Sequence, residues 1–225
     1  MKIAIIGYGK MGHAIEELAK ERGHEVVYTI DNDSQWPTTN DRKADVAIEF
    51  STPATAVENI HRCWQLRLPV VCGTTGWNAQ YESIREECIG GNHTLFTASN
   101  FSIGMNIMFA LNERLAELMQ GRSEYRVSIS ETHHIHKLDA PSGTALTLRE
   151  QIVERGERKE ENVPIESFRE GEVPGTHTVT YDSEIDTLTL THEAHSRKGL
   201  ALGALLAAEW VVGKHGVFTM KDLLA

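Results

Sequence analysis

The sequence predicts an α/β protein in which a doubly wound parallel sheet is joined to a smaller α+β domain. Over the first 100 of the 225 residues, short apolar runs alternate with segments of helical periodicity, as in parallel strands joined by crossover helices. A glycine-rich turn follows the first apolar run, and beyond Asn100 the rhythm changes to strands that alternate polar and apolar residues. We expect one domain over 1–101 and 198–225 and a second over 102–197.

The first strand, helix and second strand surround the sequence GYGKMG. Residues 3–6 form an apolar run suited to a buried parallel strand. Apolar residues then recur at helical spacing over 11–18, Gly23 stands where a helix should end, and residues 25–30 resume strand character. This order predicts a strand, a turn, a helix and a second parallel strand.

Each glycine of the turn has a separate task in a dinucleotide-binding site. The pattern G-x-G-x-x-G is formed by Gly7, Gly9 and Gly12. The first glycine allows a tight turn, the second lets the backbone approach a pyrophosphate, and the third lets helix and strand pack closely. Asp31 ends the second strand, where a carboxylate can accept a hydrogen bond from a ribose 2′-hydroxyl. Together these features predict a Rossmann-like nucleotide site; the alternative is a glycine turn that binds nothing.

Asp31 also bears on the choice between NADH and NADPH. A carboxylate at this position repels a 2′-phosphate, and Asn32 rather than an arginine follows it. Lys10 would offset part of this repulsion. We therefore expect NADH in preference to NADPH.

The remainder of the first domain continues the alternation of strands and helices. We expect strands over 44–51, 68–76 and 93–102, with helices over 54–64 and 78–89 between them. Ligands of such sheets bind beyond the carboxyl ends of the strands, where Gly73-Thr74-Thr75-Gly76 and Asn100-Phe101 fall. Small residues and hydroxyls there suit a flat nicotinamide ring; the alternative is that they are ordinary polar turns.

The second domain combines helices with half-buried strands. In chain order we expect a helix over 103–120, a strand over 125–134, a helix over 144–156, a polar loop over 157–174 and strands over 176–183 and 186–195. An apolar helix of small residues over 199–215 would pack back on the first domain.

The stretch ETHHIHKLDAPSGTAL, residues 131–146, concentrates proton carriers and cations ahead of a helix. A histidine can hold or give a proton near neutral pH, and Lys137 adds a full positive charge. The amides of residues 142–144 form the N-terminus of the following helix, which receives anions. With a nicotinamide site on the same chain, this indicates hydride transfer to a small acidic, conjugated substrate, with His133 or Lys137 as the proton donor.

A metal site and a purely structural role are the alternatives for these histidines. As metal ligands, His133, His134 and His136 would be cramped and would lack a carboxylate or cysteine at a familiar spacing. The sequence HEAH at 192–195 lacks one residue of the H-E-x-x-H pattern. Taken singly, each histidine is more often a solvated or hydrogen-bonded side chain at a strand end. We expect no metal.

Composition narrows the classes of function. The net charge of -10 argues against a nucleic-acid surface, which needs clustered lysine and arginine. The irregularly spaced Cys63, Cys72 and Cys88 fit reduced thiols better than a disulfide framework. The apolar run at the N-terminus is too short for a signal peptide or a membrane span. We expect a soluble cytoplasmic protein with no nucleic-acid or membrane partner.

Several of these motifs resemble one enzyme family. The sequence ETHHIHKLDAPSGTA is similar to the signature E-x-H-H-x-x-K-x-D-x-P-S-G-T-A of the 4-hydroxy-tetrahydrodipicolinate reductases, also called dihydrodipicolinate reductases. The sequences GYGKMG, FSTPAT, CGTTGW, SNFSIGMN, GTHTV and THEAHSRKGLALGA extend the resemblance over nearly the whole chain. The resemblance implies reduction of a dihydrodipicolinate-type imine, formed from 4-hydroxy-tetrahydrodipicolinate, to tetrahydrodipicolinate. The hydride would come from NADH or NADPH, and the pathway would be lysine and diaminopimelate biosynthesis.

The resemblance also implies roles for individual residues. His133 would be the catalytic proton donor and acceptor, and Lys137 a second proton donor or a carboxylate anchor. The small dicarboxylate substrate would be held by His134, Ser142, Gly143, Thr144 and Arg197. The cofactor would be bound by Gly7, Tyr8, Gly9, Lys10, Met11, Gly12, Asp31, Gly73, Thr74, Thr75, Ala98, Ser99, Asn100 and Phe101.

One departure from the family pattern follows Asp31. The segment 32–43 is shorter than usual, so we expect a strand and part of the wall around the adenosine to be missing. The arginine that often follows the acidic residue is also absent, which again disfavours NADPH. By resemblance we expect a homotetramer formed through the sheet of the second domain.

Two other functions are the alternatives. A different nicotinamide-dependent oxidoreductase, acting on an amino or semialdehyde substrate, would have no reason to keep both adjacent histidines and the Ser-Gly-Thr turn. A non-catalytic module that senses NAD would need no proton donor beside a carboxylate site.

Overall fold

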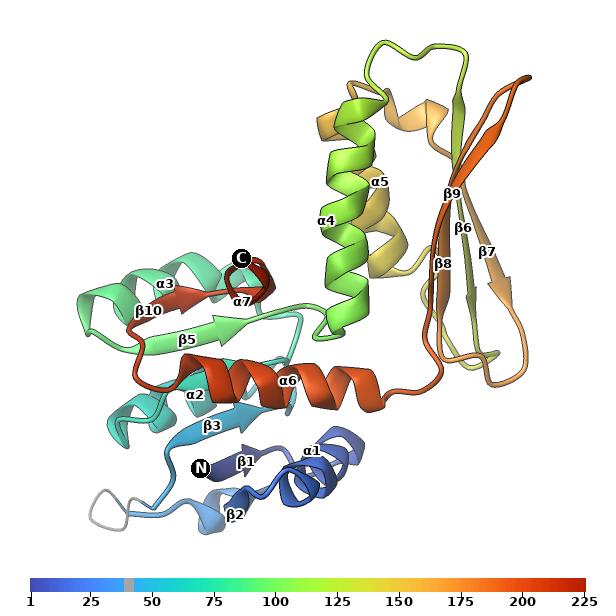
Figure 1. The fold of residues 1–225 in the computed structure, drawn as a ribbon. Helices are drawn as coiled ribbons and strands as arrows, with labels where there is room; N and C mark the ends of the chain where they lie inside the picture. Colours follow the sequence, from blue (N-terminus) through green and yellow to red (C-terminus); the bar gives the residue numbers. More distant parts are fainter. Residues whose placement is uncertain (39–42) are drawn as a thin grey trace. The chain divides into compact units, whose positions relative to one another are not determined.

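The computed structural model describes residues 1–38 and 43–225, which divide into two compact units. Unit 1 comprises Met1–Ile103 and Lys198–Ala225, and unit 2 comprises Gly104–Arg197 (Figure 1). The boundaries expected from the sequence, after residues 101 and 197, lie within two residues of these. Among the described residues, no helix combines the length and the apolarity that crossing a lipid bilayer requires.

A parallel six-stranded sheet forms the centre of unit 1, with the order β10-β5-β4-β3-β1-β2. Its strands are β1 (Lys2–Ile6), β2 (Glu25–Ile30), β3 (Val46–Glu49), β4 (Val70–Cys72), β5 (Thr94–Thr97) and β10 (Gly216–Phe218). The α-helices are α1 (Lys10–Glu21), α2 (Ala56–Gln65), α3 (Tyr81–Gly90), α6 (Lys198–Val211) and α7 (Met220–Leu224). Short 3-10 turns are η1 (Asp33–Gln35) and η3 (Asn78–Gln80). The predicted doubly wound parallel sheet is confirmed.

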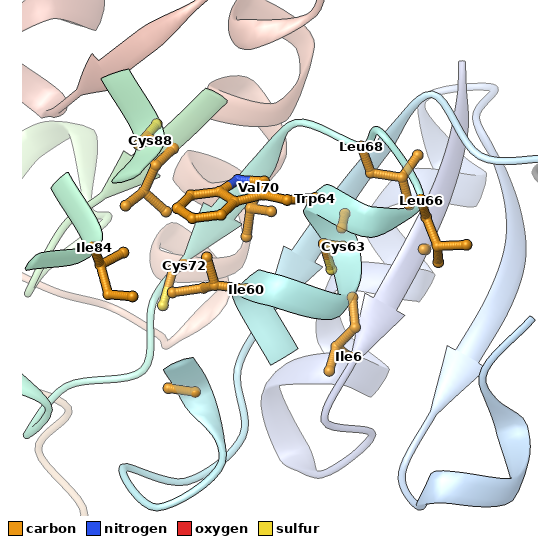
Figure 2. Close-up of a cluster of buried hydrophobic side chains, with 14 of the residues drawn as sticks. Ile6, Ile60, Cys63, Trp64, Leu66, Leu68, Val70, Cys72, Ile84 and Cys88 are labelled. Carbon is orange, nitrogen blue, oxygen red and sulfur yellow. The ribbon is translucent and has the colours of Figure 1, made fainter. Parts of the chain in front are cut away.

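Two apolar layers cover the two faces of this sheet, because successive strand residues point to opposite sides. One layer contains α2 and α3 and surrounds Trp64, whose Nε1 donates to the carbonyl of Thr94 at 3.2 Å. Figure 2 shows the indole among Ile60, Val70 and Cys72. The other layer contains α1 and α6. Burial of these side chains supplies the main stabilising free energy of the unit.

The sheet has its topological switch point at β1. This strand lies between β2 and β3, so the chain winds outward from it in opposite directions. Open α/β sheets bind ligands in the crevice beyond the carboxyl ends of the strands at such a point. Gly7 and Phe50 follow β1 and β3 there, and a Cβ on Gly7 would lie 2.0 Å from the Phe50 carbonyl oxygen.

Strand β10 was not expected from the sequence. It spans only Gly216–Phe218, which is too short to show a periodicity, and Gly213 and Gly216 read as a turn. It pairs with β5 because the helix α6 returns the chain to that edge of the sheet. The segment after Asp31 contains η1 and no strand among its described residues, as expected; residues 39–42 lie outside the described part of the chain.

Unit 2 is a four-stranded mixed sheet with two helices on one face (Figure 1). The strand order is β7-β6-β8-β9, in which β6 and β7 are parallel and the other pairs antiparallel. The elements are α4 (Ile103–Leu118), β6 (Arg126–His133), α5 (Gly143–Gly156), η4 (Glu160–Asn162), β7 (Ile165–Arg169), β8 (Thr176–Asp182) and β9 (Thr187–Glu193). The apolar core between helices and sheet includes Met108, Ile129, Leu148 and Tyr181.

Strand β7 corrects the expectation of a polar loop over 157–174. Ile165 packs inward against the core, but the next inward positions are Ser167 and Arg169. The outward Phe168 is 45% exposed, so the usual apolar-in pattern is reversed over 167–169. The reversal has a physical cause, because the inward face at this end of the sheet surrounds a buried carboxylate rather than an apolar core. The sequence IESFR therefore reads as polar although it forms a strand.

Candidate active site

The glycine turn of unit 1 has the steric features that each glycine was expected to supply. Gly7 has φ +84°, a left-handed backbone that favours glycine. A Cβ on Gly12 would lie 2.5 Å from the Gly7 carbonyl oxygen, so the helix could not pack so closely on the turn. A Cβ on Gly9 would meet nothing within 4 Å, and Gly9 is the N-cap of α1. The open space at the helix N-terminus fits a pyrophosphate.

Asp31 lies beside this turn, at the end of β2. Its Oδ1 accepts a hydrogen bond from the Tyr8 amide at 3.1 Å, and its side chain is exposed. The carboxylate therefore has capacity for further donors, as ribose binding requires. Tyr8 itself turns along α1, where its hydroxyl donates to Glu16 and its ring lies 4.0 Å from that of His13. Only the backbone of Tyr8 faces the turn.

The other predicted cofactor residues lie at the carboxyl ends of β4 and β5. A Cβ on Gly73 would lie 2.2 Å from the Phe50 ring, so glycine is required for this packing. The Thr74 hydroxyl accepts from the Ser51 amide at 2.8 Å, which joins two neighbouring strand ends. Phe101 differs from the expectation, because its side chain is 2% exposed and belongs to the core, which leaves only its backbone to meet a cofactor.

A buried carboxylate that the sequence reasoning missed supports these strand ends. Glu49 ends β3 and is fully buried. It accepts hydrogen bonds from the amide and hydroxyl of Ser51, from Asn59 Nδ2 at 3.3 Å and from Cys72 Sγ at 3.1 Å. These donors hold the turn after β3 against the turn after β4.

In unit 2, the inward face of β6 changes from apolar to charged toward its end. Val127 and Ile129 point into the core, and Glu131 and His133 continue on the same face. Glu131 is 1% exposed. Burial alone would raise the pKa of Glu131, but hydrogen bonds from Ser142 and Ser167 lower it below its usual value. The carboxylate is therefore ionised inside the protein.

His133 lies against this carboxylate. Its Nδ1 is 3.5 Å from Glu131 Oε2, and the side of its Nε2 faces Gly175, where a Cβ would lie 3.1 Å from that nitrogen. The side chain is buried, with 8% exposed. Burial lowers the pKa of His133; Glu131 opposes this shift, and Lys137 and Arg169 add to it.

Lys137 lies in the loop between β6 and α5. Its ammonium donates to both carboxylate oxygens of Asp139, at 2.8 and 2.9 Å. The pKa of Asp139 is lowered chiefly by this contact. Arg169 supports the same loop, since its Nε donates to the Lys137 carbonyl at 3.2 Å and its Nη2 donates to the Asp139 carbonyl at 2.5 Å.

Helix α5 begins at Gly143, as predicted, with Ser142 as its N-cap. The Ser142 hydroxyl accepts from the Ala145 amide at 3.2 Å, and the Ser142 amide donates to Glu131 Oε1 at 3.0 Å. Ser142 is thus fully engaged inside the protein, and of the predicted substrate contacts it is the one that the structure favours least. Gly143 is exposed, and a Cβ there would meet nothing within 4 Å. The space in front of the helix N-terminus is open.

The remaining predicted substrate residues lie together. Arg197 Nη2 is 3.0 Å from His134 Nε2. His136, by contrast, is exposed and 3.4 Å from Glu172. The structure therefore brings His134 and Arg197 into contact and leaves His136 on the surface.

A second buried histidine, His177 of β8, was missed. Its Nε2 is 3.6 Å from Glu131 Oε2 and 3.2 Å from the Ser142 hydroxyl oxygen, and its ring lies 5.0 Å from that of His133. Burial, followed by the nearby His133, lowers the pKa of His177 to about 4. His177 is therefore neutral at physiological pH.

Glu131, His133 and His177 bring possible metal-ligand atoms within 4.8 Å of one another. This set was not predicted from the sequence, because His177 belongs to β8 and lies outside the motif at 131–146. The guanidinium of Arg169, 3.5 Å from Glu131 Oε1, already supplies positive charge to the carboxylate. The same carboxylate faces the imidazoles of His133 and His177, whose N–H groups can donate to it.

The signal for Glu131 was present in the sequence. Strand alternation puts position 131 on the same face as Val127 and Ile129, so a glutamate there predicts a buried carboxylate that needs partners. Those partners could not be read from spacing, because Ser167 and His177 come from strands 36 and 46 residues further along the chain.

Both halves of the chain are similar to one known protein family. Residues 1–101 match the family described as dihydrodipicolinate reductase, N-terminus, and residues 104–224 match dihydrodipicolinate reductase, C-terminus. The chain is 49% identical to the 4-hydroxy-tetrahydrodipicolinate reductase of Christiangramia forsetii, over 100% of this chain and 98% of the relative. It is 32% identical to the reductase of the same name from Alkaliphilus oremlandii, again over 100% of this chain and 98% of the relative.

Solved structures share the fold. A dipicolinate-bound dihydrodipicolinate reductase from Paenisporosarcina sp. TG-14 superposes with a TM-score of 0.82 at 24% identity, covering 97% of each chain. A probable dehydrogenase from Thermotoga maritima has a TM-score of 0.64 at 12% identity, covering 99% of this chain and 92% of the other.

Proposed function

The chain belongs to the dihydrodipicolinate reductase family, and we propose that it reduces a dihydrodipicolinate-type imine, formed from 4-hydroxy-tetrahydrodipicolinate, to tetrahydrodipicolinate. This reaction belongs to lysine and diaminopimelate biosynthesis. One observation carries the proposal beyond family membership: an ionised buried carboxylate, an imidazole and an open helix N-terminus lie together in unit 2. That set can bind an acidic substrate and move a proton.

The substrate's carboxylates are bound by unit 2. The amides of Gly143 and Thr144 begin α5, and the helix dipole adds positive potential there. Lys137 provides an ammonium that can move from Asp139 to a substrate carboxylate, while His134 and Arg197 form a second polar pair. Ser142 contributes mainly as the N-cap that fixes the first turn of the helix.

Reduction adds a hydride to one end of the conjugated system and a proton to the other. A nicotinamide bound by the residues of unit 1 would supply the hydride. Once the ring is protonated, His133 donates from Nε2, the nitrogen that does not face Glu131. Its lowered pKa favours the neutral imidazole before substrate binds, and the negative charge of a bound dicarboxylate raises that pKa. Lys137 is the second candidate donor.

The residues of unit 1 fit a nicotinamide dinucleotide. Gly9 leaves open space at the start of α1, and Asp31 presents an exposed carboxylate beside the Tyr8 amide. An ionised carboxylate at the ribose favours the 2′-hydroxyl of NADH over the 2′-phosphate of NADPH. We infer that NADH is preferred and that the predicted residues at the ends of β1, β2, β4 and β5 bind it, Phe101 through its backbone alone.

The sheet of unit 2 supports a homotetramer. Helices α4 and α5 cover one face, and the other face carries hydroxyl side chains of β6, β8 and β9 together with Phe168. No helix among the described residues of unit 2 covers this face, and self-association through it forms the proposed oligomer. Three free buried thiols agree with a reducing compartment, and we infer a cytoplasmic location.

A turnover assay tests the proposed function. NADH and NADPH oxidation is followed at equal concentrations with enzymatically generated substrate, and the product is identified as tetrahydrodipicolinate. We expect turnover with both cofactors and a higher kcat/KM with NADH. Cofactor binding without turnover would contradict the proposal and favour a sensor, and turnover only of an amino or semialdehyde substrate would favour a different dehydrogenase.

A further inference from the structure

The buried carboxylate of Glu131 lies between the N-terminus of α5, which faces the substrate, and the His133 imidazole, which moves the proton. The two oxygens of Glu131 face different partners. Oε1 accepts from the Ser142 amide at 3.0 Å and from the Ser167 hydroxyl at 2.7 Å, and it lies 3.5 Å from Arg169 Nη2. Because Ser142 is the N-cap of α5, Oε1 fixes the position of the helix whose next amides face the substrate.

The other oxygen, Oε2, faces two imidazoles. It lies 3.5 Å from His133 Nδ1 and 3.6 Å from His177 Nε2. Glu131 Oε2 and His133 Nδ1 are both buried, and neither makes a hydrogen bond to another group among the described residues. An ionised carboxylate accepts and cannot donate, so the nitrogen facing it is most stable when it carries the proton.

This arrangement determines which nitrogen of His133 can act. With the proton on Nδ1 directed at Glu131, the neutral ring has its lone pair on Nε2, and the protonated ring has its transferable proton there. Gly175 leaves room at Nε2, since a Cβ at this position would lie 3.1 Å away and Gly175 has φ +152°. Nε2 is therefore the nitrogen free to act.

We propose that Glu131 is a positioning residue that holds the His133 ring with Nδ1–H inward and Nε2 outward, and that the same carboxylate fixes the N-terminus of α5 relative to that ring. The proposal deepens the proposed function and rests on it for the role of Nε2. His177, 3.6 Å from Glu131 Oε2, remains neutral, so it brings no positive charge that competes with His133 for the carboxylate.

The charged groups around His133 set the sign of the expected pH effect. Glu131 of β6 and Asp139 of the following loop raise its pKa, whereas Lys137 of that loop and Arg169 of β7 lower it. His177 of β8 faces the ring without charge. Replacing Glu131 by neutral glutamine removes the largest raising contribution, so the pKa of His133 falls further.

The test compares Glu131→Gln with Glu131→Asp and with Glu184→Gln, a control that removes the same charge at an exposed position in the β8–β9 turn. We expect Glu131→Gln to lower kcat by about 30-fold or more. The Kd for dipicolinate should change by less than about threefold, because the glutamine oxygen can still accept from the Ser142 amide that begins α5. Because a general acid must be protonated, activity falls as pH rises through the pKa of His133. The fall should begin at lower pH in Glu131→Gln and at wild-type pH in Glu131→Asp, with kcat intermediate.

A measurement that needs no turnover separates this proposal from the proposed function. In protein labelled with [15N]histidine, we expect His133 to carry its proton on Nδ1 in the wild type and on Nε2 in Glu131→Gln, with no change in Glu184→Gln. If Glu131→Gln does not fold, the wild-type tautomer and Glu131→Asp decide the question. Wild-type kcat in Glu131→Gln, a proton on Nε2 in the wild type, or a stoichiometric metal ion in the purified protein would overturn the proposal.

Discussion

The two sites of this molecule use the same backbone plan and opposite chemistry. The segment β1–α1–β2 of unit 1 and the segment β6–α5–β7 of unit 2 both run from a strand through a helix to a parallel neighbouring strand. In each, a charged residue at the end of the returning strand binds the turn before the helix. Asp31 accepts from the Tyr8 amide, whereas Arg169 donates to the Lys137 carbonyl.

The difference lies in the residues around the open space ahead of the helix. In unit 1, glycines leave that space empty, and their substitution would place atoms as close as 2.0 Å to the backbone. In unit 2, ionisable side chains lie around that space, and three of them, Glu131, His133 and His177, are buried. Substitutions in the first site should therefore act through steric strain, and substitutions in the second through loss of a charge or of a proton donor.

The largest expected effect comes from Gly7→Ala in unit 1. The new methyl would lie 2.0 Å from the Phe50 carbonyl oxygen at φ +84°, so we expect a loss of more than about 3 kcal/mol in the free energy of unfolding. Gly9→Ala, which meets nothing within 4 Å, should change stability by less than about 1 kcal/mol and instead weaken NADH binding. Denaturant unfolding and cofactor titration measure the two effects. Equal stability of the two variants would contradict the steric account.

His133→Gln should break the second site without unfolding it. We expect kcat to fall by about 100-fold or more, because the proton donor is lost, with a melting temperature close to that of the wild type. The control is His136→Gln, in the same motif but 70% exposed at its side chain, which should leave kcat unchanged. Wild-type turnover in His133→Gln would mean that the proton comes from another group.

Lys137→Ala distinguishes the two proposed roles of Lys137, proton donor and carboxylate anchor. Loss of the ammonium should lower kcat and raise the substrate KM, each by about tenfold, since a charge-assisted contact to a carboxylate is removed. Lys159→Ala, at an exposed lysine beside η4, serves as the control for loss of a positive charge. A change confined to kcat would identify Lys137 as a proton donor rather than an anchor.

The smallest expected effect is that of Asp31→Ala. We expect the Kd for NADH to rise by about fivefold while that for NADPH falls or stays constant, because the variant loses a ribose acceptor and a source of repulsion together. Asp33→Ala, whose carboxylate pairs with Arg62 at 2.6 Å, should not discriminate between the cofactors. Equal weakening of both cofactors by Asp31→Ala would show that Asp31 does not contact the ribose.

The same comparison explains which features could be predicted from the sequence. The unit 1 site follows from local spacing, because Gly7, Gly9, Gly12 and Asp31 belong to one strand–helix–strand segment. The structure confirms the doubly wound sheet and puts Asp31 beside the glycine turn. Phe101 was assigned to the cofactor on its position in a turn, and its burial depends on packing that spacing does not reveal.

The unit 2 site could be predicted only in its outer part. His133, Lys137 and the start of α5 lie in one motif, but Glu131 acquires its meaning from Ser167 and His177 on other strands. The contacts with Glu131 also put the polar Ser167 and Arg169 on the inward face of β7, and for this reason the sequence indicated a loop there. Long-range polar pairing therefore accounts for both the missed residues and the missed strand.

Helix α5 starts at Gly143 with its leading amides toward open space. Those N–H groups belong to the main chain, so any residue other than proline at these positions provides them. An inhibitor that anchors its acid groups on these amides has an attachment that missense mutation can hardly abolish. One that depends on Arg197 or His134 has contacts that a single nucleotide change can remove.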